Sequence, residues 1–218
     1  MHLPFSIYSF TVNLFSFMVS TFSLPIFPLS EVFLFPGTFL PLHIFEPRYR
    51  SMLSYCLENG RELAVSPYRQ SDQWNIEMET TFGFGHIIQH EALPDGRSNI
   101  ILEGLGIASL QEIISEEPFI IANVEKMIPE RNLKEDENYQ QTLDELIFLS
   151  KRILLREGAD ESLILKMNQI KNHFYPVDFL ASIIPFDYES KQKILSTTKS
   201  WEKSLLFLEV LINLNLSE

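Results

Sequence analysis

The spacing of apolar residues changes once along the chain, near Pro129. Upstream, two runs of alternating apolar residues, 81–91 and 98–107, flank the dipeptide Asp95-Gly96. Asp-Gly between two such runs is a strong signal for a β-hairpin. Downstream, strand signals end, and leucine and isoleucine recur at helical spacing over residues 143–154. These periodicities predict an α+β fold, in which a mostly antiparallel β structure with one helix precedes a helical bundle.

The stretch PLSEVFLFPGTFLPLHIFEPRYR, residues 28–50, is apolar, broken by prolines and closed by a charged cluster. Proline cannot donate to a strand ladder, so the prolines of residues 24–29 favour an edge strand over a central one. Residues 31–37 read as a strand that ends in a turn at Pro36-Gly37, and residues 38–43 read as a second short strand. We expect these segments to build the rim and corner of the β structure.

A helix is predicted to begin at Pro47, because proline is favoured at the first helical position. Glu46 would then lie at the positive end of the helix dipole. Apolar residues follow at helical spacing, and Gly60 is a suitable C-terminal cap. Arg48 and Arg50 flank Tyr49 and could form an anion site. The alternative is that Glu46 and Arg48 fix a buried strand-to-helix corner by hydrogen bonds.

The remaining elements follow from the same patterns. Three further strands are predicted besides the hairpin, and they are expected over residues 62–68, 108–114 and 119–127, with a polar loop over 70–79. Four helices are predicted after the one that ends near Gly158, and they are expected over 161–173, 177–184, 188–196 and from Trp201 onward. Asp95-Gly96 forms the hairpin turn in this arrangement.

Charge and cysteine content limit the classes of partner. The 218 residues carry a net charge of −12 without a segregated basic patch, which argues against nucleic acid as a partner. Cys56 is the single cysteine, so no intrachain disulfide can form and nothing indicates an oxidising compartment. We expect a cytoplasmic protein in which Cys56 is a small buried hydrophobe.

The first 23 residues are treated as an N-terminal extension. Residues 1–22 contain no Lys or Arg, whereas a secretory signal has a positively charged start. Polar residues interrupt this stretch too often for a membrane span of about 18 apolar residues. We expect the natural start to be Met18; a signal or anchor, or a genuine extension, remains the alternative.

No motif for catalysis, cofactor binding or metal binding stands out. His86 and His90 would lie about 13 Å apart on a strand, at about 3.3 Å per residue, which is too far for one ion. The Gly-Phe-Gly-His run at 83–86 lacks the spacing of a phosphate loop and reads as a curved or bulged strand. We therefore expect no metal and no cofactor.

The motifs of the β half resemble the amino-terminal substrate-binding domain of ATP-dependent Lon proteases. The family pattern of the opening block matches Leu24-Pro25, Phe35-Pro36-Gly37, Pro41-Leu42-His43 and Ile44-Phe45-Glu46-Pro47-Arg48-Tyr49-Arg50. Later blocks match Gly85–Ile88, Leu93–Arg97, Leu102–Gly104 and Glu117–Phe119, and weaker ones fall in the helical half. The resemblance covers roughly residues 24–214.

The resemblance implies a PUA-like β-rich subdomain over residues 24–128 and a helical subdomain over 129–218. It also implies binding of unfolded or tagged protein segments, or of a protein partner such as a separate Lon protease. The oligomeric state is open. The 218 residues contain neither a Walker A loop nor a peptidase segment, so we expect a binding module and no enzyme. The alternative is a small-ligand-binding or hydrolytic enzyme with a site in the PUA-like part.

The motif positions are expected to be structural and not catalytic. They are Pro36, Gly37, His43, Glu46, Pro47, Arg48, Tyr49, Asp95 and Gly96.

Overall fold

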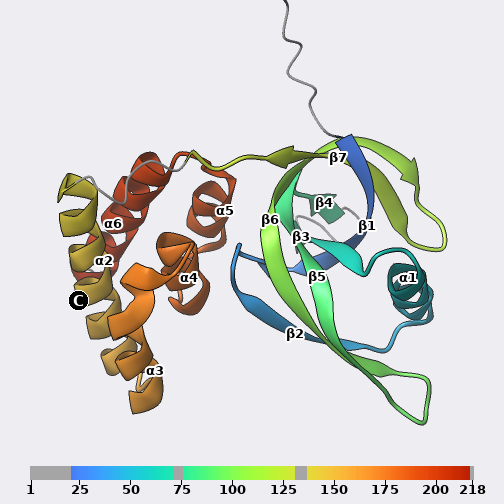
Figure 1. Cartoon of the computed structure of the whole chain (residues 1–218), viewed down its shortest axis with the longest axis horizontal. Coiled ribbons are helices and arrows are strands. Elements are labelled where there is room, and N and C mark those ends of the chain that lie inside the picture. The colour runs from blue at the N-terminus through green and yellow to red at the C-terminus, as the bar shows by residue number, and fades with distance from the viewer. Residues whose placement is uncertain (1–20, 71–75, 131–136, 217–218) are drawn as a thin grey trace, which may run out of the picture.

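The computed structural model of this chain describes residues 21–70, 76–130 and 137–216. A β part and a helical part lie side by side, and one extended segment at the end of β7 joins them (Figure 1). The fold is α+β, as predicted. β1 begins at Thr21, so residues 21–23 of the expected extension belong to the first strand. Met18 and the rest of that extension lie outside the described residues.

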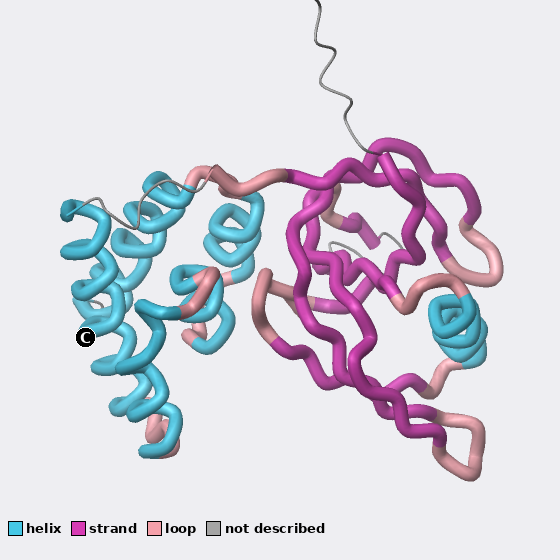
Figure 2. Tube along the Cα trace, in the orientation of Figure 1, coloured by secondary structure: helices cyan, strands magenta, loops and turns pink. Residues whose placement is uncertain are grey.

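Among the described residues, the β part contains seven strands and helix α1. In chain order they are β1 (Thr21–Ser30), β2 (Phe39–Ile44), α1 (Pro47–Glu58), β3 (Glu62–Gln70), β4 (Ile76–Met78), β5 (Thr81–Ala92), β6 (Ser98–Ser115) and β7 (Ile120–Met127). The strand order β1-β7-β6-β5-β3 closes into a ring, because β1 also pairs with β3 in parallel. Figure 2 shows this ring, with α1 on the side away from the other helices. Among the described strands, β2 pairs only with β6, so it is an edge strand.

The prediction that the first strand lies at an edge is wrong. β1 pairs with β7 over residues 21–26 and with β3 over residues 26–30. Pro25 lies in the first stretch and Pro28 in the second. Each proline therefore has a partner strand on one side only, and its missing N–H need not interrupt a ladder. The division of the pairing along β1 explains how two prolines fit a strand with two neighbours.

The segment after β1 is a connection and not the strand predicted for residues 31–37. Glu31 has a φ of 57°, which turns the chain out of β1. Leu34 and Phe35 are fully buried in spite of their irregular backbone. The predicted turn at Pro36-Gly37 is present, and Gly37 adopts a φ of 71°. The connection thus changes the direction of the chain and also contributes side chains to the core.

Glycines of β5 and β6 allow this connection to lie directly on the sheet. A Cβ atom at Gly83 would lie 1.8 Å from the carbonyl oxygen of Leu34, and one at Gly104 would lie 2.1 Å from that of Phe35. The pairing of β5 with β6 also shifts register between Phe84 and Gly85. The interpretation of the run at 83–86 as part of a bulged strand is confirmed. The close approach of the Leu34 backbone gives a second reason for the glycine at 83.

Two other strand predictions need correction. The strands expected over 98–107 and 108–114 form one strand, β6, because two register shifts against β7 bend it without ending it. The polar loop expected over 70–79 contains the short strand β4, which pairs with β3. The hairpin at Asp95-Gly96 is confirmed, with Gly96 at a φ of 82°.

Helix α1 follows the prediction closely. It begins at Pro47 and ends at Glu58, and Gly60 follows the C-cap with a φ of 93°. Its apolar stripe packs into the core of the β part. Cys56 belongs to this stripe and is 1% exposed, and burial raises the pKa of its thiol to about 12. The prediction of a buried structural cysteine is confirmed.

The helical part is built from five α-helices and one 3-10 segment in the described residues. They are α2 (Glu137–Arg156), α3 (Glu161–Lys166), η1 (Met167–Asn172), α4 (Pro176–Ile183), α5 (Tyr188–Ser196) and α6 (Ser200–Leu216). The helix expected over 161–173 is α-helical only to Lys166 and continues as η1. The change from strand to helix falls between Met127 and Glu137. The division into subdomains at residue 129 remains our proposal.

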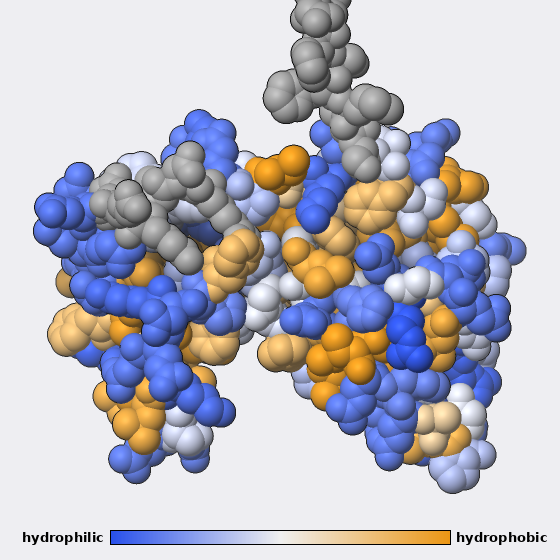
Figure 3. All heavy atoms as spheres, in the orientation of Figure 1, coloured by the Kyte–Doolittle hydropathy of each residue, from blue (hydrophilic) through white to orange (hydrophobic). Residues whose placement is uncertain are grey.

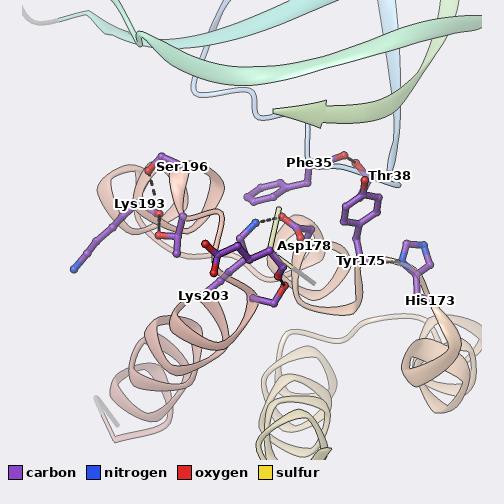
Figure 4. A network of polar contacts seen from close by, with 11 residues as sticks. Phe35, Thr38, His173, Tyr175, Asp178, Lys193, Ser196 and Lys203 are labelled. Carbon is purple, nitrogen blue, oxygen red and sulfur yellow. Dashed lines mark hydrogen bonds and ion pairs between the residues drawn. The ribbon is translucent and has the colours of Figure 1, made fainter. Parts of the chain in front are cut away.

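The first turns of α4 and α6 are joined by a buried ion pair. Lys203 Nζ donates to Asp178 Oδ1 at 2.5 Å, and both side chains are more than nine-tenths buried. Tyr139 of α2 lies close by, and its pKa is raised by burial and then by the charge of Asp178. Figure 4 shows this pair between the helices, below the strands. Three helices therefore meet around one buried charge pair.

Two sets of contacts hold the β part against the helical part. Arg69 of β3 forms a two-pronged ion pair with Glu189 of α5, with 2.8 Å between Nη2 and Oε2. The Tyr188 hydroxyl donates to Glu79 Oε1 at 2.9 Å. Phe35 of the β1–β2 connection is buried in the same apolar cluster as the helix cores. The junction is therefore held both by polar contacts between side chains and by an apolar core to which the two parts contribute.

Candidate functional site

A cleft of about 190 Å³ lies where β1, β2 and the start of α1 meet. We call it the β1–β2 cleft. Its wall comes from the second half of β1, the end of β2, the strand-to-helix corner and one residue of β3. The lining residues are Phe27, Pro28, Leu29, Ser30, Leu42, His43, Ile44, Phe45, Glu46, Arg48, Tyr49 and Tyr68. Four of them, His43, Glu46, Arg48 and Tyr49, are motif positions singled out from the sequence.

The local sequence explains the shape of this corner. β2 ends at Ile44, whose side chain is buried, and the next side chain, Phe45, is 58% exposed. Glu46 keeps an extended backbone with ψ at 138°, and Pro47 then starts α1. Because the chain changes from strand to helix within these four residues, an aromatic ring is left at the surface beside the cleft.

The charged rim of the cleft lies next to an aromatic wall. Arg48 Nε donates to Glu46 Oε2 at 3.2 Å, and the guanidinium carbon lies 4.4 Å from the centroid of the Tyr49 ring. The Tyr49 ring in turn lies 4.4 Å from the ring of Phe27. Burial raises the pKa of Tyr49, and the neighbouring Arg48 charge opposes this rise. The cleft therefore offers apolar contact with one paired set of charges at its edge.

The predicted hydrogen bond between Glu46 and Arg48 is present, but the corner is not buried as expected. The Arg48 side chain is 57% exposed and that of Glu46 is 42% exposed. The carboxylate of Glu46 does not cap α1 either. An exposed pair of this kind contributes little to stability, about 0–1 kcal/mol. The pair shapes the rim of the cleft more than it holds the corner together.

His43 lies on the exposed face of β2 and is fixed by a polar chain. Its Nδ1 lies 2.8 Å from Asn99 Oδ1, and Asn99 Nδ2 donates to Glu91 Oε2 at 3.0 Å. Because the amide oxygen only accepts, Nδ1 of His43 carries the proton in this arrangement. The His43 and Phe45 rings lie 6.0 Å apart. His43 is thus held by the hairpin and borders the cleft.

The other motif positions lie elsewhere in the fold. Pro36-Gly37 forms the turn at the junction, where a Cβ at Gly37 would lie 2.8 Å from Cε1 of His173. Figure 4 shows His173 and Tyr175 beneath the segment that carries Phe35 and Thr38.

Asp95-Gly96 forms the tip of the β5–β6 hairpin. Asp95 Oδ2 accepts from Arg97 Nε at 2.6 Å, and these hydrogen bonds lower the pKa of Asp95. The Arg50 guanidinium lies close to Gly96, so a Cβ there would be 2.7 Å from its Nη1. Pro47 starts α1. The structure therefore brings only part of the motif to the cleft.

Sequence reasoning missed the far wall of the cleft and its flanking aromatic residue. Phe27 and Leu29 come from β1 and Tyr68 from β3, and their approach depends on the parallel pairing of β1 with β3. Phe39 at the start of β2 is 62% exposed. The alternation along β2 was the available signal, because residues 39, 41 and 43 share the exposed face.

The described residues show little that could support metal chemistry or a membrane span. Over residues 21–70, 76–130 and 137–216, no group of three or more His, Cys, Asp and Glu side chains is placed to hold a metal ion. Within the same ranges, no helix has the length and apolar character needed to cross a bilayer. The stretch for which a signal or anchor is the alternative to a start at Met18 lies outside these ranges.

The architecture is that of the amino-terminal domain of Lon proteases, a PUA-like β part with one helix followed by helices. The N-terminal domain of Mycobacterium avium complex Lon protease has a TM-score of 0.69 and 16% identity, and the match covers 88% of this chain and 98% of that one. A Lon N-terminal domain protein from Xanthomonas campestris gives a TM-score of 0.63 at 18% identity, with 88% and 97% covered.

The chain belongs to the family of the ATP-dependent protease La (LON) substrate-binding domain, whose sequence model matches residues 23–212. The Lon protease of Flavobacterium johnsoniae is 23% identical over 187 residues, which are 84% of this chain and 23% of that protein. The Lon protease of Porphyromonas gingivalis is 25% identical over 195 residues, 86% of this chain and 23% of that protein. The chain thus spans about a quarter of the length of these curated relatives.

Proposed function

We propose that this LON domain binds apolar segments of unfolded or tagged proteins, or of a protein partner, in the β1–β2 cleft. The family description as a substrate-binding domain supports protein substrates as the class of ligand. The observation that carries the location is Phe45, an aromatic side chain that is 58% exposed at the edge of an apolar cleft. Binding sites combine such an apolar centre with a polar rim, which Glu46 and Arg48 supply here.

Replacing Phe45 with serine tests this location. We expect the mutant to bind reduced, carboxyamidomethylated lysozyme, a permanently unfolded protein, about tenfold more weakly than the wild type, because truncating an aromatic that contacts the client costs more than about 1 kcal/mol. Fluorescence anisotropy of the labelled lysozyme measures the change.

The matched control is Phe148→Ser on α2, since Phe148 is 59% exposed and lies on the helical part. This variant should bind as the wild type does. Equal losses in the two variants, or no loss in either, would place the binding surface elsewhere.

We further propose that the 218-residue chain acts by binding alone, without hydrolysing ATP or peptide bonds. Its family match is to the substrate-binding domain, and the sequence contains no Walker A loop. We expect neither phosphate release from ATP with Mg²⁺ nor cleavage of labelled unfolded lysozyme by the purified chain. Turnover that disappears after a single substitution in the β part would favour a hydrolytic enzyme instead.

A further inference from the structure

Among the described residues, one edge of β2 has no partner strand, and we call it the open edge. β2 pairs with β6 alone in the part of the chain that the structure describes. The N–H of Gly104 in β6 donates to the carbonyl of Thr38 at 2.9 Å, just before β2 begins. Because backbone groups of an antiparallel strand alternate between its two edges, residues 40, 42 and 44 face β6. Phe39, Pro41 and His43 therefore turn their backbone polar groups toward the open edge.

Pro41 fits this alternation. Proline in a sheet is confined to positions where no ladder donor is required, and Pro41 lies on the open side. The edge consequently offers the carbonyl groups of residues 39, 41 and 43 and the N–H groups of Phe39 and His43. An extended backbone complements such a row of groups, whereas a helix has no free backbone groups to offer it.

The side chains around the edge suit an apolar occupant. Phe39 is 62% exposed at one end of β2, and Phe45 is 58% exposed just past the other end. Residues 42–46 also line the β1–β2 cleft. Figure 3 shows apolar residues grouped on the surface where Figure 1 places β2. A strand added to β2 would thus run between two aromatic rings and could place a side chain in the cleft.

The charge of the neighbouring strands selects among apolar segments. β2, β5 and β6 carry the carboxylates of Glu91, Glu103 and Glu112 and contain no Lys or Arg. Glu103 lies directly opposite Phe39 in the ladder. Arg48 on the cleft rim is paired with Glu46, and Arg97, which directly precedes β6, is paired with Asp95. The whole chain adds a net charge of −12. A segment with Lys or Arg is complementary to this surface, and an acidic one is repelled.

We propose that an extended, apolar segment bearing Lys or Arg binds as an added strand along the open edge of β2, with one side chain in the β1–β2 cleft. This inference rests on the proposed function, because the segment is the client of that function. It goes further in naming the conformation, the charge and the backbone contacts of the client.

N-methylated peptides test the strand geometry directly. The probe is a short fluorescent peptide that alternates lysine with valine or phenylalanine, together with two versions N-methylated at either the odd or the even positions. A strand uses the N–H groups of one edge only. We expect one methylated version to bind about tenfold more weakly, since each lost hydrogen bond weakens binding about three- to tenfold, and the other to bind like the parent. Equal affinity of all three peptides would overturn the proposal.

A pair of substitutions at His43 provides the second test. His43→Pro removes an N–H from the open edge, and His43→Ala removes the side chain while keeping that N–H. Both variants lose the cleft-lining imidazole, and only His43→Pro also loses the edge N–H. We therefore expect His43→Pro to bind the peptide about three- to tenfold more weakly than His43→Ala does. Far-UV circular dichroism checks that each variant folds. Equal affinity of the two folded variants would show that the N–H of this edge is not used.

The outcomes also separate this inference from the proposed function. Unfolded lysozyme is measured alongside the peptides. Lysozyme binding that depends on Phe45, with no effect of N-methylation, overturns strand addition and leaves the cleft in place. Failure of wild-type protein to bind either probe overturns both. A peptide in which glutamate replaces lysine should bind more weakly, and equal binding would refute the charge preference.

Discussion

Replacing Lys203 with methionine is expected to lower the free energy of unfolding by about 3–5 kcal/mol. The Lys203 and Asp178 side chains are 6% and 8% exposed, and 2.5 Å separates their charged atoms. Removing the ammonium takes the Lys203 cation away from the buried Asp178 carboxylate, and the desolvation of that carboxylate is then less well offset. Urea unfolding followed by circular dichroism measures the change.

The same helix supplies a matched control. Lys199 pairs with Glu202 at 2.8 Å, but these side chains are 54% and 58% exposed. Lys199→Met should therefore change the stability by about 1 kcal/mol or less. A loss of similar size in both methionine variants would show that burial of the Lys203 pair has no special effect.

A double replacement separates charge from packing. Lys203→Met combined with Asp178→Leu removes both charges and keeps apolar volume at the site. Such replacements of a buried pair are often neutral or stabilising. We expect the double variant to be more stable than Lys203→Met alone. If it is equally unstable, the loss comes from repacking around α4 and α6 and not from the loss of the Lys203 charge beside Asp178.

Periodicity predicted the elements whose partners are local. The stripe from Tyr49 to Cys56, with Pro47 before it and Gly60 after it, describes α1 almost completely. The hairpin at Asp95-Gly96 likewise depends on residues that are neighbours in the sequence. In both places the turn or cap residue and the apolar pattern indicate the same structure, so little information from the rest of the fold is needed.

Contacts between distant segments could not be predicted in this way. The parallel pairing of β1 with β3 joins residues 26–30 to residues 64–68. No pattern within either sequence segment predicts this pairing. This pairing makes β1 a two-sided strand and places Phe27 and Leu29 opposite the motif corner. The sequence motif therefore identified only the residues of β2 and α1 that line the cleft, and not those of β1 and β3.

The motif carries two kinds of residue. His43, Glu46, Arg48 and Tyr49 line the cleft. Gly37 and Gly96 instead adopt φ angles of 71° and 82°, which residues with a side chain rarely adopt. A resemblance based on the whole motif therefore mixes positions that suit binding with positions that the backbone requires. Substitutions at the two glycines should impair folding directly. A loss of binding in such variants would therefore not locate the surface that contacts the client.

Gly83→Ala is expected to be among the most damaging single changes in the β part. The new Cβ would lie 1.8 Å from the Leu34 carbonyl oxygen and 2.8 Å from its carbon, both backbone atoms. A flexible side chain could move aside, but here the connection from β1 to β2 must shift. Leu34 and the adjacent Phe35 are almost completely buried. We expect a loss of about 3 kcal/mol or more in the free energy of unfolding.

Gly106→Ala in β6 is the control for this change. There the nearest atom to a new Cβ is Cε1 of the Phe84 ring at 3.0 Å, which is the far end of a side chain. A change within about 1 kcal/mol is expected, because alanine also reduces the freedom of the unfolded chain. Phe35 packs into the helical cluster, so Gly83→Ala should also loosen the junction. Limited proteolysis would detect this as faster cleavage within residues 31–37. Wild-type stability together with unchanged cleavage in Gly83→Ala would mean that the connection does not lie against β5 as described.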